Sequence, residues 1–106
     1  MEIVLLKQAK RELQDAPPDV IEDIFALFED LAAGKMLSLP ISRPLPSIAK
    51  GLHELRFSGK RGEYRVFYAI QIGDAIYVIH ATVKKKNEID RKTTELLKTR
   101  MRSLGL

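Results

Sequence analysis

The 106-residue sequence contains no cysteine, which excludes a disulfide scaffold, a thiolate zinc site and a cysteine nucleophile. Long apolar runs are also missing: stretches such as Ile24 to Phe28 are far shorter than the ~20 residues that cross a bilayer. The first residues lack the basic start and the apolar stretch of a signal peptide. We find no internal repeat and no interdomain linker. We therefore expect one cytoplasmic domain, residues 1–106, without a membrane partner.

Charge is unevenly distributed along the chain. Residues 1–40 carry four basic and eight acidic side chains, a net charge of −4, whereas residues 41–106 carry fourteen basic and six acidic ones, a net charge of +8. A segment that basic attracts polyanions, of which nucleic acid is the commonest in a cytoplasm. The division favours a polyanionic ligand or an acidic protein partner over a role in solubility alone.

Hydrophobic periodicity predicts an α+β fold. Residues 3–6 suit an edge strand and residues 7–14 a helix, while Pro17-Pro18 begins a second helix that Gly34 ends. The proline-rich region 35–50 is predicted to be a surface loop. Three strands follow, over residues 52–57, 63–72 and 75–83, and a last helix begins between Asn87 and Arg91. Helices followed by an antiparallel sheet and a terminal helix are typical of the α+β class.

The turns predict the register of the sheet. A two-residue Gly73-Asp74 turn places Arg65 opposite Thr82 and Phe67 opposite His80. A four-residue loop at 59–62 places Arg56 opposite Arg65, and we prefer it because a five-residue loop would place Arg56 on the buried face. Alternation then assigns an apolar face, packed on the first two helices, and a more polar face turned away from them. The apolar face holds Tyr64, Val66, Tyr68, Ile70, Tyr77, Ile79, Ala81 and Val83, and the polar face holds Glu63, Arg65, Phe67, Ala69, Gln71, Ile76, Val78, His80 and Thr82.

The polar face gathers Arg56, Arg65, His80 and Lys84. Two neighbouring guanidiniums repel each other unless an anion lies between them, and the guanidinium fork matches phosphate oxygens. Arg56 alternatively forms a surface salt bridge with Glu54 or Glu63. His80 suits a general acid or base near neutral pH, although a single histidine is more often structural.

No metal-ligand spacing, glycine-rich phosphate loop or Ser/His/Asp arrangement is present, so we expect chemistry without metal or cofactor. Any catalysis would rely on cationic side chains that stabilise charge on a phosphoryl group.

Three segments resemble the RelE/HigB toxins, and most closely the phage-derived HigB-like branch of that superfamily. They are KGLHELR at residues 50–56, EYRVFYA at 63–69 and IHATVKK at 79–85. The resemblance implies a RelE-like fold, with a helical hairpin on a mostly antiparallel sheet and a C-terminal helix. It also implies a type II toxin that cleaves mRNA in the ribosomal A site by attack of the ribose 2′-OH, which leaves a 2′,3′-cyclic phosphate. The implied partners are the ribosome, its mRNA and a cognate antitoxin, expected to be a helix-turn-helix protein.

By this resemblance, Arg65 contacts the scissile phosphate, Lys84 stabilises developing charge, and Arg56 lies on the neighbouring strand. With His80, these are the predicted catalytic residues. The predicted RNA-binding residues are Lys85, Lys86, Lys60 and Arg61.

The chain also departs from RelE itself, which has lysines at the positions of Leu52 and Glu54 and a tyrosine near Asp90. Because of these departures, the resemblance does not identify the general base. They also favour an alternative function, that of a ParE-like toxin that binds DNA gyrase and cleaves no RNA. On the toxin reading, Arg65→Ala is expected to remove toxicity and leave the fold intact. An antitoxin segment is expected to cover Arg56, Arg65 and the lysine run, with binding that weakens as salt rises.

Overall fold

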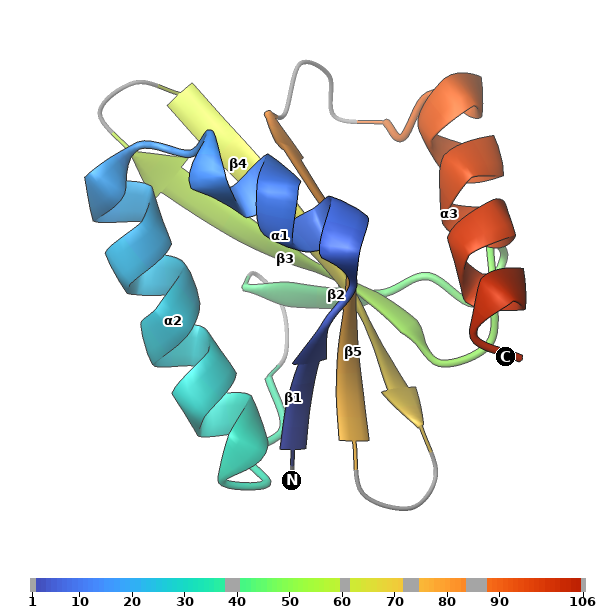
Figure 1. The fold of residues 1–106 in the computed structure, drawn as a ribbon, viewed down its shortest axis with the longest axis horizontal. Coiled ribbons are helices and arrows are strands. Elements are labelled where there is room, and N and C mark those ends of the chain that lie inside the picture. The colour runs from blue at the N-terminus through green and yellow to red at the C-terminus, as the bar shows by residue number, and fades with distance from the viewer. Residues whose placement is uncertain (1, 38–40, 60–61, 72–74, 84–87, 106) are drawn as a thin grey trace.

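The computed structural model describes residues 2–37, 41–59, 62–71, 75–83 and 88–105. A five-stranded sheet forms its centre, with three helices around it (Figure 1). The strands run in the order β1-β5-β4-β3-β2, and all neighbours are antiparallel except β1 and β5, which are parallel. The bounds are β1 Glu2–Leu5, α1 Lys7–Gln14, α2 Pro18–Ala32, β2 Ser42–Pro44, β3 Leu52–Gly59, β4 Gly62–Gln71, β5 Ala75–Val83 and α3 Arg91–Ser103.

The helices agree closely with the sequence prediction. Helix α1 has the predicted bounds, and α2 begins at Pro18, where the fixed proline φ suits a first helical turn. The side chain of Asp90 caps α3 by accepting a hydrogen bond of 2.7 Å from the backbone N–H of Thr93. None of the helices in the described part of the chain is long and apolar enough to span a membrane.

The hairpin of β3 and β4 has the predicted register, with Arg56 opposite Arg65 and Glu54 opposite Phe67. The hairpin of β4 and β5 has the predicted register over only part of its length. Arg65 faces Thr82 and Phe67 faces His80 as expected, but the register then shifts, so Tyr68 pairs with Val78. The bulge leaves Ile79 as an extra residue on β5.

This bulge overturns two predictions. Gln71 pairs with Ala75, so three residues separate the strands and the predicted two-residue turn is wrong; residues 72–74 themselves lie outside the described part. The faces of β5 before the bulge are also exchanged. Ile76 and Val78 pack with the core under α1 and α2, whereas Tyr77 and Ile79 pack on the opposite side.

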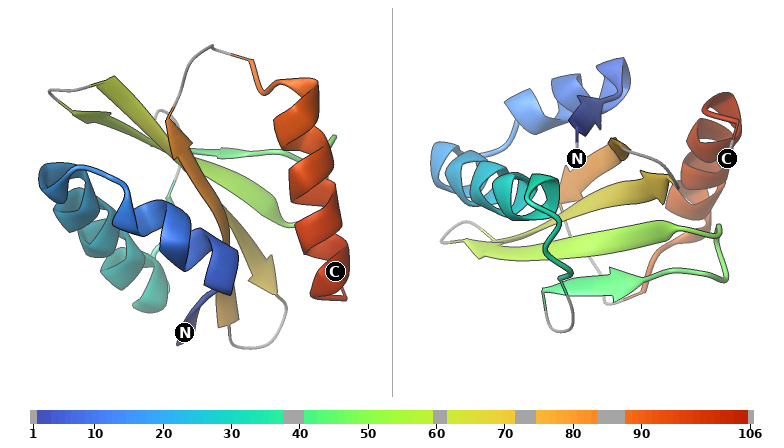
Figure 2. Two further views of the ribbon diagram at one scale, coloured as in Figure 1. Left: turned by 45° about the horizontal axis from the view of Figure 1, so that its top comes forward. Right: turned by 90° about the horizontal axis from the view of Figure 1, so that it is seen from below.

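Two further predictions need correction. The region 35–50 was expected to be a loop throughout, yet Ser42–Pro44 forms the edge strand β2 and pairs with β3. The face assigned to polar residues is also partly covered: α3 packs on it through Leu97 and Met101, against a patch of Leu52, Phe67, Ala69 and Ile79. Figure 2 shows α2 and α3 on opposite sides of the central strands, with α1 between them. The end of this face that carries Arg56 and Arg65 remains polar.

Candidate functional site

Three arginines meet around one carboxylate on the sheet face that also packs against α3. Glu54 lies on β3, directly opposite Arg43 of β2, two residues before Arg56 and diagonal to Arg65 of β4. Residues paired across strands, and residues two apart on one strand, point to the same face. The sheet register alone therefore brings the four side chains together, and we call them the arginine cluster.

The carboxylate of Glu54 contacts all three guanidiniums. Its Oε1 accepts a hydrogen bond of 2.9 Å from Arg56 Nε and lies 3.3 Å from Arg43 Nη2, while its Oε2 lies 3.0 Å from Arg65 Nε. The Glu54 side chain is 0% exposed, against 34% for Arg43, 31% for Arg56 and 5% for Arg65. The cluster is thus anchored at a buried centre and has two partly solvated arms. Its net charge is +2.

Arg65 is the buried arm. Its 3.0 Å contact with Glu54 is an ion pair rather than a hydrogen bond, because the geometry between Nε and Oε2 is poor although the distance is short. Its Nη1 also donates to the backbone carbonyl of Glu88 over 3.4 Å. Burial lowers the pKa of Arg65, as do the charges of Arg56 and Arg43, while Glu54 and, less strongly, Glu63 act in the opposite direction. Glu54 therefore offsets part of the electrostatic cost of this buried cation.

Two hollows border the cluster and share Glu88. One, of about 310 Å³, is lined by Arg65, the end of β5 and the first turn of α3: Thr82, Val83, Glu88, Asp90, Lys92 and Thr93. The other, of about 540 Å³, is mainly apolar and begins at Arg43: Pro44, Leu45, Pro46, Ser47, Ile48, Glu88, Ile89 and Thr94. Arg65 therefore borders open space in the smaller hollow and Arg43 in the larger one, whereas Arg56 lines neither.

A comparison with models of known protein families identifies the family of this chain. A family model described as "Phage derived protein Gp49-like (DUF891)" matches residues 11–102. The chain belongs to this Gp49-like family. A search of curated proteins gives no match.

The solved structures that share the fold of this Gp49-like chain include RelE proteins. The toxin–antitoxin complex RelBE2 from Mycobacterium tuberculosis matches with a TM-score of 0.59 and 21% identity, covering 78% of this chain and 96% of that one. The isolated E. coli RelE toxin gives 0.58 and 14%, covering 92% and 96%, and the intact E. coli RelBE complex gives 0.51 and 13%, covering 80% and 98%. At these identities the likeness concerns the fold, and it confirms the predicted RelE-like architecture.

The other predicted site residues of the Gp49-like chain have different surroundings. Lys84, Lys85 and Lys86 follow β5, and Lys60 and Arg61 join β3 to β4; all five lie outside the described residues. Val83, the last residue of β5, lines the smaller hollow.

His80 belongs to a second ionic network. Its Nδ1 lies 2.8 Å from Glu12 Oε2 of α1, and Arg100 Nη1 of α3 donates to Glu12 Oε1 over 2.8 Å and to the carbonyl of Ile79 over 2.9 Å. The ring of Phe67 stacks on the imidazole, with centroids 5.8 Å apart. These contacts join α1, β5 and α3, so the described partners of His80 are structural.

Burial also sets the protonation of this network. Burial lowers the pKa of His80, although the hydrogen bond that His80 donates to Glu12 acts against that. For Glu12, burial opposes ionisation, but the hydrogen bonds from Arg100 and His80 prevail, so its pKa also lies below the usual value. At neutral pH the network therefore consists of an uncharged imidazole, a carboxylate and a guanidinium.

His53, in contrast, lies on the opposite face, where it stacks on Tyr68.

Sequence reasoning missed Arg43 and the central role of Glu54. Arg43 falls in the segment predicted to be a loop, so nothing placed it beside β3. Glu54 was considered only as a surface partner of Arg56. The described residues contain no group of three His, Asp or Glu side chains suited to a metal ion. The arginine cluster is suited to binding a phosphate, because guanidiniums donate paired hydrogen bonds to phosphate oxygens.

Proposed function

We propose that this chain is the toxin of a type II toxin–antitoxin pair and that it cleaves mRNA in the A site of the ribosome. The observation that carries the proposal is the arginine cluster: three guanidiniums around one buried carboxylate, with a net charge of +2, next to an open hollow. The Gp49-like family and the RelE-like fold support the same reading. Fold alone does not assign an activity, so the argument depends on the cluster.

The proposed reaction needs no group other than the RNA and cationic side chains. The ribose 2′-oxygen forms a bond to the adjacent phosphorus, and the bond from phosphorus to the 5′-oxygen breaks, leaving a 2′,3′-cyclic phosphate. The 2′-OH loses its proton to a base, and the 5′-oxygen gains one. Negative charge on the phosphoryl oxygens increases as the new bond forms. Guanidiniums that are already in place stabilise that charge more strongly than water does.

Arg56 and Arg43 are the arms that reach the substrate in this proposal, because about a third of each side chain is exposed. Arg65 contributes positive potential from the floor of the site and borders the hollow. Lys84 is proposed to add a cation from the end of β5. Glu54 does not serve as the base, because its side chain is fully buried among the arginines. His80 remains a candidate for proton transfer only if it leaves Glu12.

An antitoxin is the proposed protein partner. Two of the structures that share the fold are toxin–antitoxin complexes. We expect an acidic segment of the antitoxin to cover the arginine cluster, which would block the phosphate site by charge neutralisation.

The test uses Arg56→Ala rather than Arg65→Ala. The sequence suggested that Arg65 contributes little to the fold, but it is buried in an ion pair, so its removal also perturbs stability. Arg56→Ala is expected to reduce A-site cleavage by roughly 10²-fold or more, the usual loss of one transition-state donor. The measurement is primer extension on ribosome-bound message, with detection of the 2′,3′-cyclic phosphate end.

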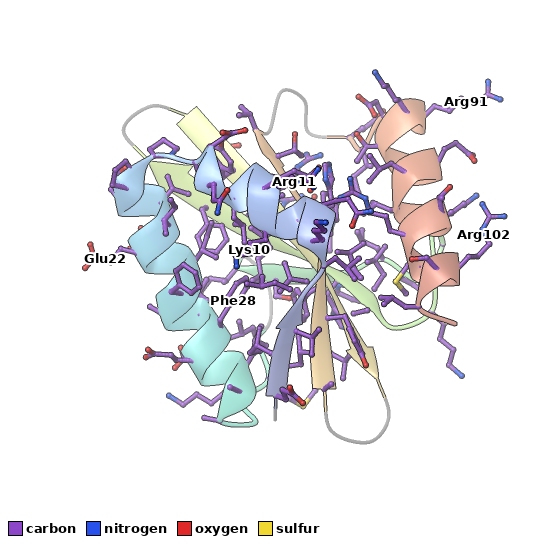
Figure 3. All side chains as sticks on the ribbon, in the orientation of Figure 1. Lys10, Arg11, Glu22, Phe28, Arg91 and Arg102 are labelled. Carbon is purple, nitrogen blue, oxygen red and sulfur yellow. The ribbon has the colours of Figure 1, made fainter. Side chains whose placement is uncertain are left out.

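Arg102→Ala serves as the matched control. Arg102 projects from α3 into solvent (Figure 3) and lies outside the cluster, so its removal is expected to leave cleavage unchanged. Full cleavage by a folded Arg56→Ala protein would refute the proposal. Growth arrest with gyrase-trapped DNA breaks and no cuts in mRNA would replace it with the ParE-like function.

A further inference from the structure

Glu54 occupies an unusual place for an acidic residue, since its side chain is 0% exposed in a region that carries a positive charge. An isolated carboxylate rarely tolerates such burial, and here three guanidiniums compensate for the lost water. The position follows from the sheet: Arg43 lies across from Glu54 on one side, and Arg65 lies diagonally across on the other. Among the described residues of the cluster, Glu54 is the one carboxylate, and it forms an ion pair with each of the three arginines.

The contacts with Glu54 leave N–H donors of the two solvated arms, Arg43 and Arg56, available. Glu54 engages the Nε of Arg56, the Nε of Arg65 and the Nη2 of Arg43. Each arginine has five N–H donors in a rigid plane. Arg56 contacts Glu54 through its Nε, which fixes the plane of the guanidinium. The described contacts of Arg56 do not use its Nη atoms, so these can donate to an anion. Arg43 also has a buried Nε without an acceptor among the described residues.

Charge explains why a carboxylate is needed at this point. Three guanidiniums within reach of one carboxylate repel one another, and the repulsion would spread the two solvated arms apart. One negative charge at the centre reduces the repulsion and still leaves a net charge of +2 for a phosphodiester.

We propose that Glu54 is a positioning residue of the phosphate site, and that it aligns Arg56 and Arg43 for the phosphate while it neutralises Arg65. The inference rests on the proposed function for its catalytic consequence, but not for the alignment itself. A competing interpretation gives Glu54 the opposite effect: the carboxylate occupies the place of the phosphate and competes with it.

Glu54→Gln separates these interpretations, because the amide keeps the shape and removes the charge. If Glu54 positions the arginines, single-turnover cleavage of ribosome-bound message falls by up to about 10²-fold, the cost of a misplacement near 1 Å, while KM changes less than twofold. If Glu54 competes with the phosphate, Glu54→Gln cleaves as fast as the parent protein or faster, and the proposal is overturned.

A double variant tests whether Glu54 acts through Arg56. The loss in Glu54→Gln/Arg56→Ala is expected to be smaller than the product of the two single losses, because Glu54 acts partly through Arg56 and only Arg43 remains for it to position. Losses that multiply would contradict the proposal. Glu54→Asp keeps the negative charge but moves it back by one methylene, so we expect an activity between those of the parent protein and Glu54→Gln. If Glu54→Gln does not fold, Glu54→Asp is used in its place.

An experiment on the free protein distinguishes failure of this inference from failure of the proposed function. The arginine Nε–Hε signals are recorded by NMR while inorganic phosphate is added. In the parent protein, we expect the signals of Arg56 and Arg43 to shift on titration, and in Glu54→Gln the dispersed Arg56 signal is expected to move to the position of a solvated arginine. This pattern without any mRNA cleavage would support the alignment and refute the nuclease. An unchanged Arg56 signal in Glu54→Gln would refute the alignment even if the parent cleaves.

Discussion

The buried ion pair of Glu54 and Arg65 allows a quantitative prediction about stability. In Glu54→Leu, Arg43 and Arg56 can turn toward water, because each is about one-third exposed, and the loss of such exposed pairs costs roughly 0–1 kcal/mol. Arg65 is 5% exposed and has no such route. Removal of one partner of a buried pair costs about 3–5 kcal/mol. Because Arg65 borders a hollow, we expect the lower end, about 3 kcal/mol.

This loss is a large part of the total for a small domain, whose free energy of unfolding is typically about 5–15 kcal/mol. The assay is urea unfolding followed by far-UV circular dichroism, with an unchanged m-value as evidence that the unfolded state is the same. The double variant Glu54→Leu/Arg65→Met replaces the pair by apolar side chains of similar volume. It is expected to regain most of the loss, since such replacements are often neutral or stabilising.

The control for this cycle is Glu22→Leu on α2, an exposed glutamate that points away from the sheet (Figure 3). Its effect is expected to stay within about 0.5 kcal/mol. A loss below about 1 kcal/mol in Glu54→Leu would show that Arg65 is well solvated. A double variant no more stable than Glu54→Leu would show that the two residues are not coupled. Either result would refute the account of a buried, charge-compensated centre.

Two further predictions concern the backbone and pH. Gly51 has a φ of +83°, and a Cβ there would lie 3.2 Å from the carbonyl oxygen of Ile70, so Gly51→Ala is expected to lower the free energy of unfolding by about 1–2 kcal/mol in urea. Gly105 has a φ of +75° but open space around it, so Gly105→Ala should cost less. Equal losses in the two variants would contradict the close approach of Gly51 to Ile70. Burial lowers the pKa of His80, so the unfolded chain takes up a proton first, and stability should fall as pH drops below about 6.5 and through the lower folded pKa. Glu12 adds a further loss at lower pH, where its own carboxylate becomes protonated. His80→Gln should reduce the slope of stability against pH below about 6.5, leaving a part due to His53, whose pKa burial also lowers. An unchanged slope would contradict the assignment to His80.

Local sequence signals predicted the helices well because they are carried by neighbouring residues. Pro17-Pro18 and the 3.6-residue periodicity define α2, and no distant contact is needed to find them. Strand β2 carries no such signal: it has three residues, ends in Pro44, and exists because β3 offers it an edge. An isolated short edge strand is decided by pairing and not by propensity.

The bulge at Ile79 shows a different limit. Residues 76–79 are all apolar or aromatic, so either register buries hydrophobic side chains on both faces, and alternation does not discriminate between them. Past the bulge, where Thr82 faces Arg65, the polar side chains restore the distinction and the predicted register is right. The prediction therefore placed Arg56 and Arg65 side by side correctly, but it assigned the residues of β5 before the bulge to the wrong faces of the sheet.

The same reasoning explains why the arginine cluster is more informative than its individual members. A leucine and a methionine in place of Glu54 and Arg65 would hold β3 and β4 together at least as well, since buried ion pairs seldom exceed apolar packing in stability. The sheet therefore does not need these charges. What needs them is a ligand that a hydrophobic surface repels: an anion that accepts several hydrogen bonds at once. Within the cluster, one carboxylate faces three guanidiniums, so these four side chains together carry a charge of +2. Glu63 also acts on Arg65, and Glu88 and Asp90 line the adjacent hollow, so the excess belongs to the cluster itself. A purely structural ion pair would need only one guanidinium on Glu54, and this carboxylate contacts three.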